Sequence, residues 1–252
     1  MMQAYSDLYL DKAQRTLGAM LDFAFERCAL PLDVFFDAFI ETGFAARFNN
    51  GAPDVIAGMS GLELAIAVIH SACNQMLPSS GLLRDALTDA NIDSVNPSGA
   101  LYALADAYTP VGGVSSAYWT GWALAYYQWA SAYSFKDICS LVPVSVVMSH
   151  YRPYHEMDIS HFCALMDGLI REVHPRTRLQ ERRIAAGLSQ SQLAEASGVP
   201  VRTLQQYEQR QKDISKAQVC SVVQFAKVLH CEVEDLLEHN ASSCYEYHVV
   251  SL

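Results

Sequence analysis

The sequence predicts an all-α protein of two domains, a helical N-terminal domain followed by a compact bundle of five short helices. Apolar residues recur at spacings of three and four along most of residues 5–173, which is the period of an amphipathic helix. Strand-like alternation is found only weakly, in YEYHVV at 245–250. Pro175 disfavours helix at the residue before it, so we place the domain boundary there. The predicted parts are residues 1–174, residues 175–240 and a tail, 241–252.

The N-terminal domain divides into helices at its prolines, glycines and capping residues. Ser6 and Ser60 are the expected caps of two of these helices, and Pro31 ends one helix and starts the next. FNNGAP at 48–53 has the composition of a turn, and residues 78–99 form a connecting region with one short helix. The predicted helices cover residues 5–30, 31–43, 60–76, 115–133, 134–142, 144–151 and 158–173.

Charge is distributed unevenly between the two predicted domains. The chain has 252 residues, of which 51% are apolar, enough for a sizeable core, and its net charge is −10. Residues 1–174 hold 8 Lys and Arg against 18 Asp and Glu, whereas residues 175–238 hold 9 against 8. The acidic part should repel DNA and anionic membrane surfaces, so any contact with nucleic acid must come from the second part.

The cysteines and the N-terminus indicate a cytoplasmic protein. The 7 cysteines are odd in number, widely spaced and without a CxxC motif, a pattern typical of reduced thiols. The N-terminus MMQAYSDLYLDKAQ is polar and acidic, unlike a signal peptide. The longest apolar runs, such as 141–148, are too short to span a membrane, so we expect no membrane contact.

The segment LSQSQLAEASGVPVRTLQQYEQ, residues 188–209, has the local signals of two helices joined by a tight turn. Ser189 and Gln192 have the spacing of a capping box, which starts a helix at Gln190. Gly198 is suited to the left-handed conformation that ends this helix. A second helix is predicted to begin near Val201.

The second helix has an apolar and a polar face. Leu204 and Tyr207 face back toward the first helix. Arg and Gln are the side chains that make bidentate contacts with guanine and adenine in the major groove. The pattern therefore predicts a helix-turn-helix with a recognition helix. The outward residues are Arg202, Thr203, Gln205, Gln206 and Gln209.

Further helices are predicted on both sides of this pair. Residues 178–186 supply a basic helix before it. Ser215 and Gln218 have capping-box spacing for a later helix, and residues 233–237 supply a last short one. The later helix has an inward face made of Val219, Val222, Val223, Ala226 and Leu229.

Together these motifs resemble the Cro/C1-type (XRE) helix-turn-helix family, whose domain has the lambda-repressor-like fold. The matching features lie in residues 177–239 and include GLSQxxLAxxSGV, the pair Leu204 and Glu208, and the closing FAKVLHCEVEDLL. Two residues depart from the pattern. Arg210 stands where the family often has glycine, which questions the tight turn there, and Arg182 stands where an apolar residue is common.

The resemblance implies binding of double-stranded DNA by a homodimer at a palindromic operator. It implies base contacts from Val201, Arg202, Gln205 and Gln206. It also implies phosphate contacts from Gln190 and nearby polar or basic residues. The candidate phosphate-contacting residues are Arg178, Arg183, Gln190, Thr203, Arg210 and Lys212.

Two clusters in the N-terminal domain have alternative interpretations. The aromatic residues of 119–133, including Trp119, Trp122 and Trp129, recur at helical spacing; they form a core, line a groove for a partner helix, or hold a flat ligand. HYRPYHEMDISH at 150–161 contains metal-ligating residue types but matches no closed zinc pattern. A turn with Asp158 or Ser160 capping the next helix explains it more simply, so we expect no metal and no cofactor.

The leading hypothesis is a sequence-specific transcriptional regulator, acting as a repressor, without enzymatic activity. An alternative is an antitoxin or adaptor that binds a partner protein, such as a toxin, through residues 1–174 and autoregulates its operon. A third hypothesis gives the N-terminal domain an enzymatic or ligand-sensing pocket. The sequence itself does not decide among them, because the N-terminal domain resembles no family.

Overall fold

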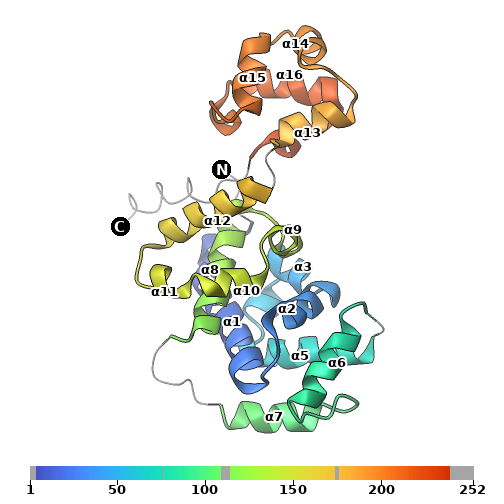
Figure 1. The fold of residues 1–252 in the computed structure, drawn as a ribbon, viewed down its shortest axis with the longest axis vertical. Coiled ribbons are helices and arrows are strands. Elements are labelled where there is room, and N and C mark those ends of the chain that lie inside the picture. The colour runs from blue at the N-terminus through green and yellow to red at the C-terminus, as the bar shows by residue number, and fades with distance from the viewer. Residues whose placement is uncertain (1–3, 76, 109–113, 174–175, 239–252) are drawn as a thin grey trace. The chain divides into compact units, whose positions relative to one another are not determined.

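The computed structural model describes residues 4–75, 77–108, 114–173 and 176–238. The described residues divide into two compact units, unit 1 up to Leu169 and unit 2 from Ile170. Within the described residues all regular secondary structure is helical, which confirms the predicted all-α class (Figure 1). The boundary predicted at 174–175 and the strand-like stretch 245–250 lie outside the described residues.

Unit 1 is built from helices of very different lengths. The first helix, α1, continues into a π-helical turn, η2, and α12 extends past Leu169 into the range of unit 2. The elements are η1 (Asp7–Tyr9), α1 (Leu10–Asp22), η2 (Phe23–Arg27), α2 (Leu32–Glu41), α3 (Phe44–Asn49), α4 (Pro53–Ile56), α5 (Gly61–Asn74), α6 (Ser80–Asp89), α7 (Ser98–Asp106), α8 (Ser116–Ser131), α9 (Phe135–Leu141), α10 (Val144–Ser149), α11 (Tyr151–Tyr154) and α12 (Ile159–Val173).

The core of unit 1 forms where α1 packs against both α8 and α5. Glycines allow backbone contact at these crossings. A Cβ added at Gly121 of α8 would lie 2.4 Å from the Leu17 carbonyl oxygen, and one added at Gly61 of α5 would lie 2.5 Å from the Thr16 carbonyl oxygen. No Cβ atom fits at such distances, so both crossings require glycine.

The aromatic stripe of α8 belongs to this core. Trp119, Tyr126 and Trp129 are 5%, 7% and 0% exposed, and Trp119 packs edge-to-face on Phe162 of α12 with ring centroids 5.2 Å apart. Tyr127, also on α8, donates a 2.8 Å hydrogen bond to the Asp167 carboxylate. Of the three interpretations of the stripe, the packed core is therefore the one the structure supports.

Several local predictions in unit 1 need correction. Ser60 forms the expected N-cap, with a reciprocal capping box to Glu63, but the Ser6 side chain makes no capping hydrogen bond. The turn predicted at 48–53 is shorter than expected, because its ends belong to two helices that were not predicted, α3 and α4. The connecting region 78–99 contains α6 and the first residues of α7. The helices α3 and α4 have only 6 and 4 residues, which is too short to show a helical period.

The histidine-rich segment is occupied by local contacts. The Nδ1 atoms of His150 and His155 lie 2.8 Å and 3.1 Å from the carbonyl oxygens of Val146 and Tyr151. The Asp158 carboxylate accepts from the Ser160 amide at 2.9 Å, as expected for a cap at the start of α12. Across the described parts of the chain, no group of three or more His, Cys, Asp or Glu side chains is arranged to hold a metal ion.

Unit 2 contains the predicted short helices around a small apolar core. They are α13 (Arg178–Ala185), α14 (Gln190–Ser197), α15 (Val201–Glu208), η3 (Ile214–Lys216), α16 (Val219–Leu229) and η4 (Val233–Leu236). The core contains Leu193, Leu204 and Phe225, each 0% exposed. Val219, expected to face inward, is 76% exposed because it is the first residue of α16 and lies beyond the core.

The helices described in both units are too short or too polar to cross a lipid bilayer.

Candidate nucleic-acid interface

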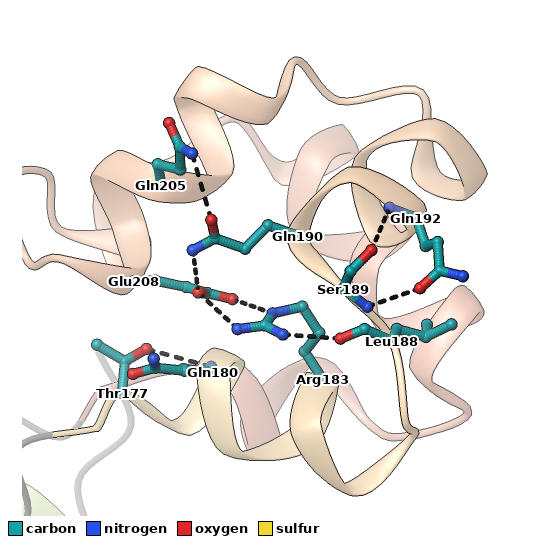
Figure 2. Close-up of polar contacts among 9 residues, drawn as sticks. All are labelled: Thr177, Gln180, Arg183, Leu188, Ser189, Gln190, Gln192, Gln205 and Glu208. Carbon is teal, nitrogen blue, oxygen red and sulfur yellow. Dashed lines mark hydrogen bonds and ion pairs between the residues drawn. The ribbon is translucent and has the colours of Figure 1, made fainter.

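The turn between α14 and α15 forms from the local signals that the sequence contains. The Ser189 hydroxyl accepts from the Gln192 amide at 3.2 Å, and the Gln192 side-chain oxygen accepts from the Ser189 amide at 2.8 Å (Figure 2). Gly198 ends α14 in the left-handed conformation, with φ of 69°. Pro200 precedes α15, which begins at Val201 as predicted.

The recognition helix α15 separates its residues into a buried and an outward face. Leu204 and Tyr207 are 0% and 9% exposed, which confirms their predicted inward position. The predicted base-contacting residues lie on the other side. Val201 and Arg202 are exposed, while Gln205 and Gln206 are partly exposed.

A buried ion pair joins α13 to α15. The Arg183 guanidinium donates to both carboxylate oxygens of Glu208, at 2.6 Å and 3.0 Å, and to the Leu188 carbonyl at 2.7 Å (Figure 2). The side chains of Arg183 and Glu208 are 11% and 1% exposed. Buried charges of this kind are strongly unfavourable unless paired and hydrogen-bonded, and here both conditions hold. The pair therefore joins α15 to α13. Arg183 also binds the Leu188 carbonyl, just before the N-cap of α14.

Two glutamine side chains extend this ion pair toward the protein surface. Gln190 donates from Nε2 to the Glu208 carboxylate at 2.8 Å. Gln205 in turn donates from Nε2 to the Gln190 Oε1 at 3.2 Å (Figure 2). We call Glu208, Gln190 and Gln205 the amide relay. It connects the buried carboxylate to a side chain on the outward face of α15.

A second carboxylate gathers two of the predicted phosphate-contacting residues. The Glu238 carboxylate accepts from the Arg178 amide at 2.8 Å and pairs with the Arg210 guanidinium at 3.4 Å. Arg210 also donates to the Arg176 carbonyl at 3.0 Å. Its φ is 53°, so the residue standing in the place of glycine does adopt the left-handed turn. Glu238, near the end of the domain, is thereby bound to the first residue of α13 and to the turn after α15.

Several arginines of unit 2 form ion pairs within it. Arg182 adds a third ion pair, to Asp235 at 3.0 Å, and its side chain is 49% exposed. The structure brings Arg183 and Gln190 together at Glu208, and Arg178 and Arg210 together at Glu238. Lys212 is exposed.

Glu208 is the structural residue whose role the sequence analysis missed. The sequence contained a signal for it, because Glu208 follows the inward Leu204 by four positions and so lies on the same face of α15. An acidic residue on a buried face requires a cationic partner, and α13 offers the arginines. Helical spacing alone could not identify which of them points inward.

Comparison with known proteins supports the same interpretation. Residues 179–236 match the helix-turn-helix family model, and this range includes nearly all of α13 and extends through η4. No curated protein and no solved structure matches the chain. With the capped α14, the left-handed turn and the exposed face of α15, residues 179–236 form a DNA-binding helix-turn-helix domain of the Cro/C1 (XRE) type.

Proposed function

We propose that the protein is a sequence-specific transcriptional regulator, acting as a repressor, which inserts α15 into the major groove of an operator. The observation that carries the proposal is the outward face of α15, where Arg202 and Val201 are exposed and Gln205 and Gln206 lie beside them. These side chains have the donors, acceptors and methyl groups that distinguish base pairs in the major groove.

The contacts divide into base reading and phosphate binding. We assign base reading to Arg202, for guanine, and to Val201, whose methyl groups suit the thymine methyl. We also assign it to Gln205 and Gln206, whose amides suit adenine. Phosphate contact is assigned to Thr203 on α15, to Lys212 after this helix and to Gln190 at the start of α14.

Arg183 and Arg210 have other roles in this proposal. The Arg183 guanidinium is bonded to Glu208 and Leu188 inside the domain, so it acts by positioning Gln190 and α15. The Arg210 guanidinium pairs with Glu238. Arg178 binds the same carboxylate through its backbone amide only, so its side chain stays among the proposed phosphate-contacting residues. Few phosphate contacts then remain, and non-specific affinity for DNA should be modest.

The direct test is alanine substitution on α15. Arg202→Ala and Gln206→Ala are each expected to cost roughly 1–3 kcal/mol of operator binding and to relax base preference at the position read. Binding would be measured by fluorescence anisotropy on operator and random duplexes. Arg152→Ala, an exposed arginine of α11, makes the same charge change and should leave base preference intact. Wild-type affinity of both α15 variants for both duplexes would refute the assignment.

A second candidate function is that of an antitoxin or adaptor, which binds a partner protein through unit 1 and regulates its own operon. It is favoured by large apolar side chains of unit 1 that face solvent, with Leu82 62%, Val95 88% and Tyr102 56% exposed. Purification of the tagged chain from its host tests it. A stoichiometric partner lost on removal of residues 1–174 supports the candidate, whereas a clean homodimer contradicts it.

A further inference from the structure

We propose that Gln205 reads adenine in preference to guanine, because the amide relay fixes which end of its side chain faces the groove. This inference rests on the proposed function, since it assumes that α15 enters the major groove. It concerns the orientation of the Gln205 amide, which the residue type alone does not determine. A glutamine amide is free to turn by half a rotation, which exchanges its donor and its acceptor.

The relay starts at Glu208, whose ionised carboxylate can accept hydrogen bonds but cannot donate them. Glu208 pairs through both oxygens with Arg183, whose guanidinium stays protonated. An ionised carboxylate only accepts hydrogen bonds. Gln190 must therefore present its Nε2 to Glu208, and the distance of 2.8 Å agrees with this orientation.

The orientation of Gln190 in turn determines that of Gln205. With Nε2 of Gln190 held by Glu208, its Oε1 faces Gln205. That oxygen is an acceptor, so Gln205 must offer a donor, and its Nε2 lies 3.2 Å away. The Gln205 amide is consequently left with its Oε1 and one remaining N–H for an outside partner.

This pair of groups matches one purine. Adenine presents a donor at N6 and an acceptor at N7 in the major groove, so Oε1 and the remaining N–H of Gln205 can engage both. Guanine presents acceptors at both O6 and N7, and the fixed Oε1 would oppose O6. Cytosine offers a donor to Oε1 but no second acceptor, so it should bind less well than adenine.

Gln206 provides an internal comparison on the same helix. Among the described residues no side-chain hydrogen bond is recorded for its amide, whereas the Gln205 amide is held by Gln190. A Gln206 amide that turns freely suits adenine in one orientation and donates to guanine in the other. Base preference should accordingly be stricter at the position read by Gln205.

The test is selection of binding sites from a randomised duplex pool with the full chain. The position read by Gln205 is identified as the one whose preference disappears in Gln205→Ala. Wild type should select adenine over guanine there by about tenfold or more. Gln190→Met keeps the length of the side chain and removes the relay, and it should bring this ratio toward one. Gln180→Met, on α13 and outside the relay, makes the same chemical change and should keep the ratio.

A second measurement uses wild-type protein and modified DNA, so it does not depend on the folding of a variant. Replacing the selected adenine by 2-aminopurine removes the 6-amino donor and should weaken binding about fivefold or more. Selection of guanine or cytosine at this position, or an unchanged ratio in folded Gln190→Met, overturns the relay while leaving the regulator proposal in place. Failure of wild type to select any sequence overturns both.

Discussion

Units 1 and 2 both pack short helices, but they do so with different chemistry. In unit 1 the central contacts are backbone against backbone at Gly121 and Gly61, surrounded by large aromatic side chains. In unit 2 a small apolar core, in which Phe225 is the only one of the largest fully buried side chains of the described residues, is accompanied by the buried pair Arg183 and Glu208. The contacts in unit 1 give a closely packed core, whereas the ion pair in unit 2 orients the polar side chains around it.

The difference shows what a buried charge contributes. An apolar core has no preferred direction, whereas a carboxylate bound by an arginine specifies which atoms face it. In unit 2 that specification reaches the outward face of α15 through Gln190 and Gln205. Unit 1 also buries carboxylates, at Asp22 and Asp167, but there neutral hydroxyl groups such as that of Tyr127 donate to them.

The largest expected effect comes from breaking the buried pair. Glu208→Ala leaves the Arg183 guanidinium buried without its carboxylate, so we expect a loss of about 3–5 kcal/mol in the stability of unit 2. Hydrogen–deuterium exchange of the full chain, resolved by peptide, should show faster exchange in α13–α16 and unchanged exchange in α1, α5 and α8.

Two controls sharpen this comparison. Asp11→Ala removes an ion pair with Arg15 whose side chains are 73% and 67% exposed, and should change stability by less than about 1 kcal/mol. The double variant Arg183→Met with Glu208→Leu replaces the pair by apolar groups and should recover most of the loss. If Glu208→Ala costs no more than Asp11→Ala, the pair does not organise unit 2.

The next effect should come from the helix crossing in unit 1. Gly121→Ala would place a methyl group 2.4 Å from the Leu17 carbonyl oxygen, so α1 and α8 must separate. We expect a cost of about 3 kcal/mol, measured by urea unfolding, with exchange accelerated in unit 1 alone. Gly168→Ala in α12 meets open space and should stabilise by roughly 0.5–1 kcal/mol. Equal behaviour of the two variants would disprove the close crossing.

The smallest effect compares one capping box in each unit. Ser60→Ala and Ser189→Ala each remove a hydroxyl that accepts from a backbone amide, at 3.2 Å in both cases. Each should lower stability by about 1 kcal/mol, detected by thermal unfolding. Ser145→Ala removes a hydroxyl that caps no helix and serves as the control; a Ser189→Ala variant as stable as this one would contradict the capping assignment.

The two boxes should differ in their response to acid. Hydrogen bonds from the Ser60 backbone and side chain lower the pKa of the Glu63 carboxyl. A lowered folded-state pKa means stabilisation that is present above the unfolded pKa and is lost as pH falls through the folded value. Gln192 takes the place of the acid in the second box and does not titrate. Glu63→Gln removes the titrating group and should therefore reduce the acid sensitivity of unit 1, while Gln192→Ala should not change that of unit 2.

Much of unit 2 could be predicted from the sequence because its signals are local. The box of Ser189 and Gln192, the left-handed Gly198 and the inward Leu204 each involve residues close together in the chain. The capping box predicted at Ser215 and Gln218 was wrong, and the reason is also a local contact. Asp213 accepts from the Ser215 amide at 2.9 Å, so Ser215 lies in a 3₁₀ turn and α16 starts after Gln218.

The sequence by itself determined the helical class, the capped pair of helices and the face of α15 that carries Arg202, because helical period and capping act within a few residues. Only the tertiary structure decided that Arg183 turns inward to Glu208 and that Gln205 joins Gln190. These partners are 25 and 15 residues apart, and the direction of a long polar side chain depends on which distant group meets it.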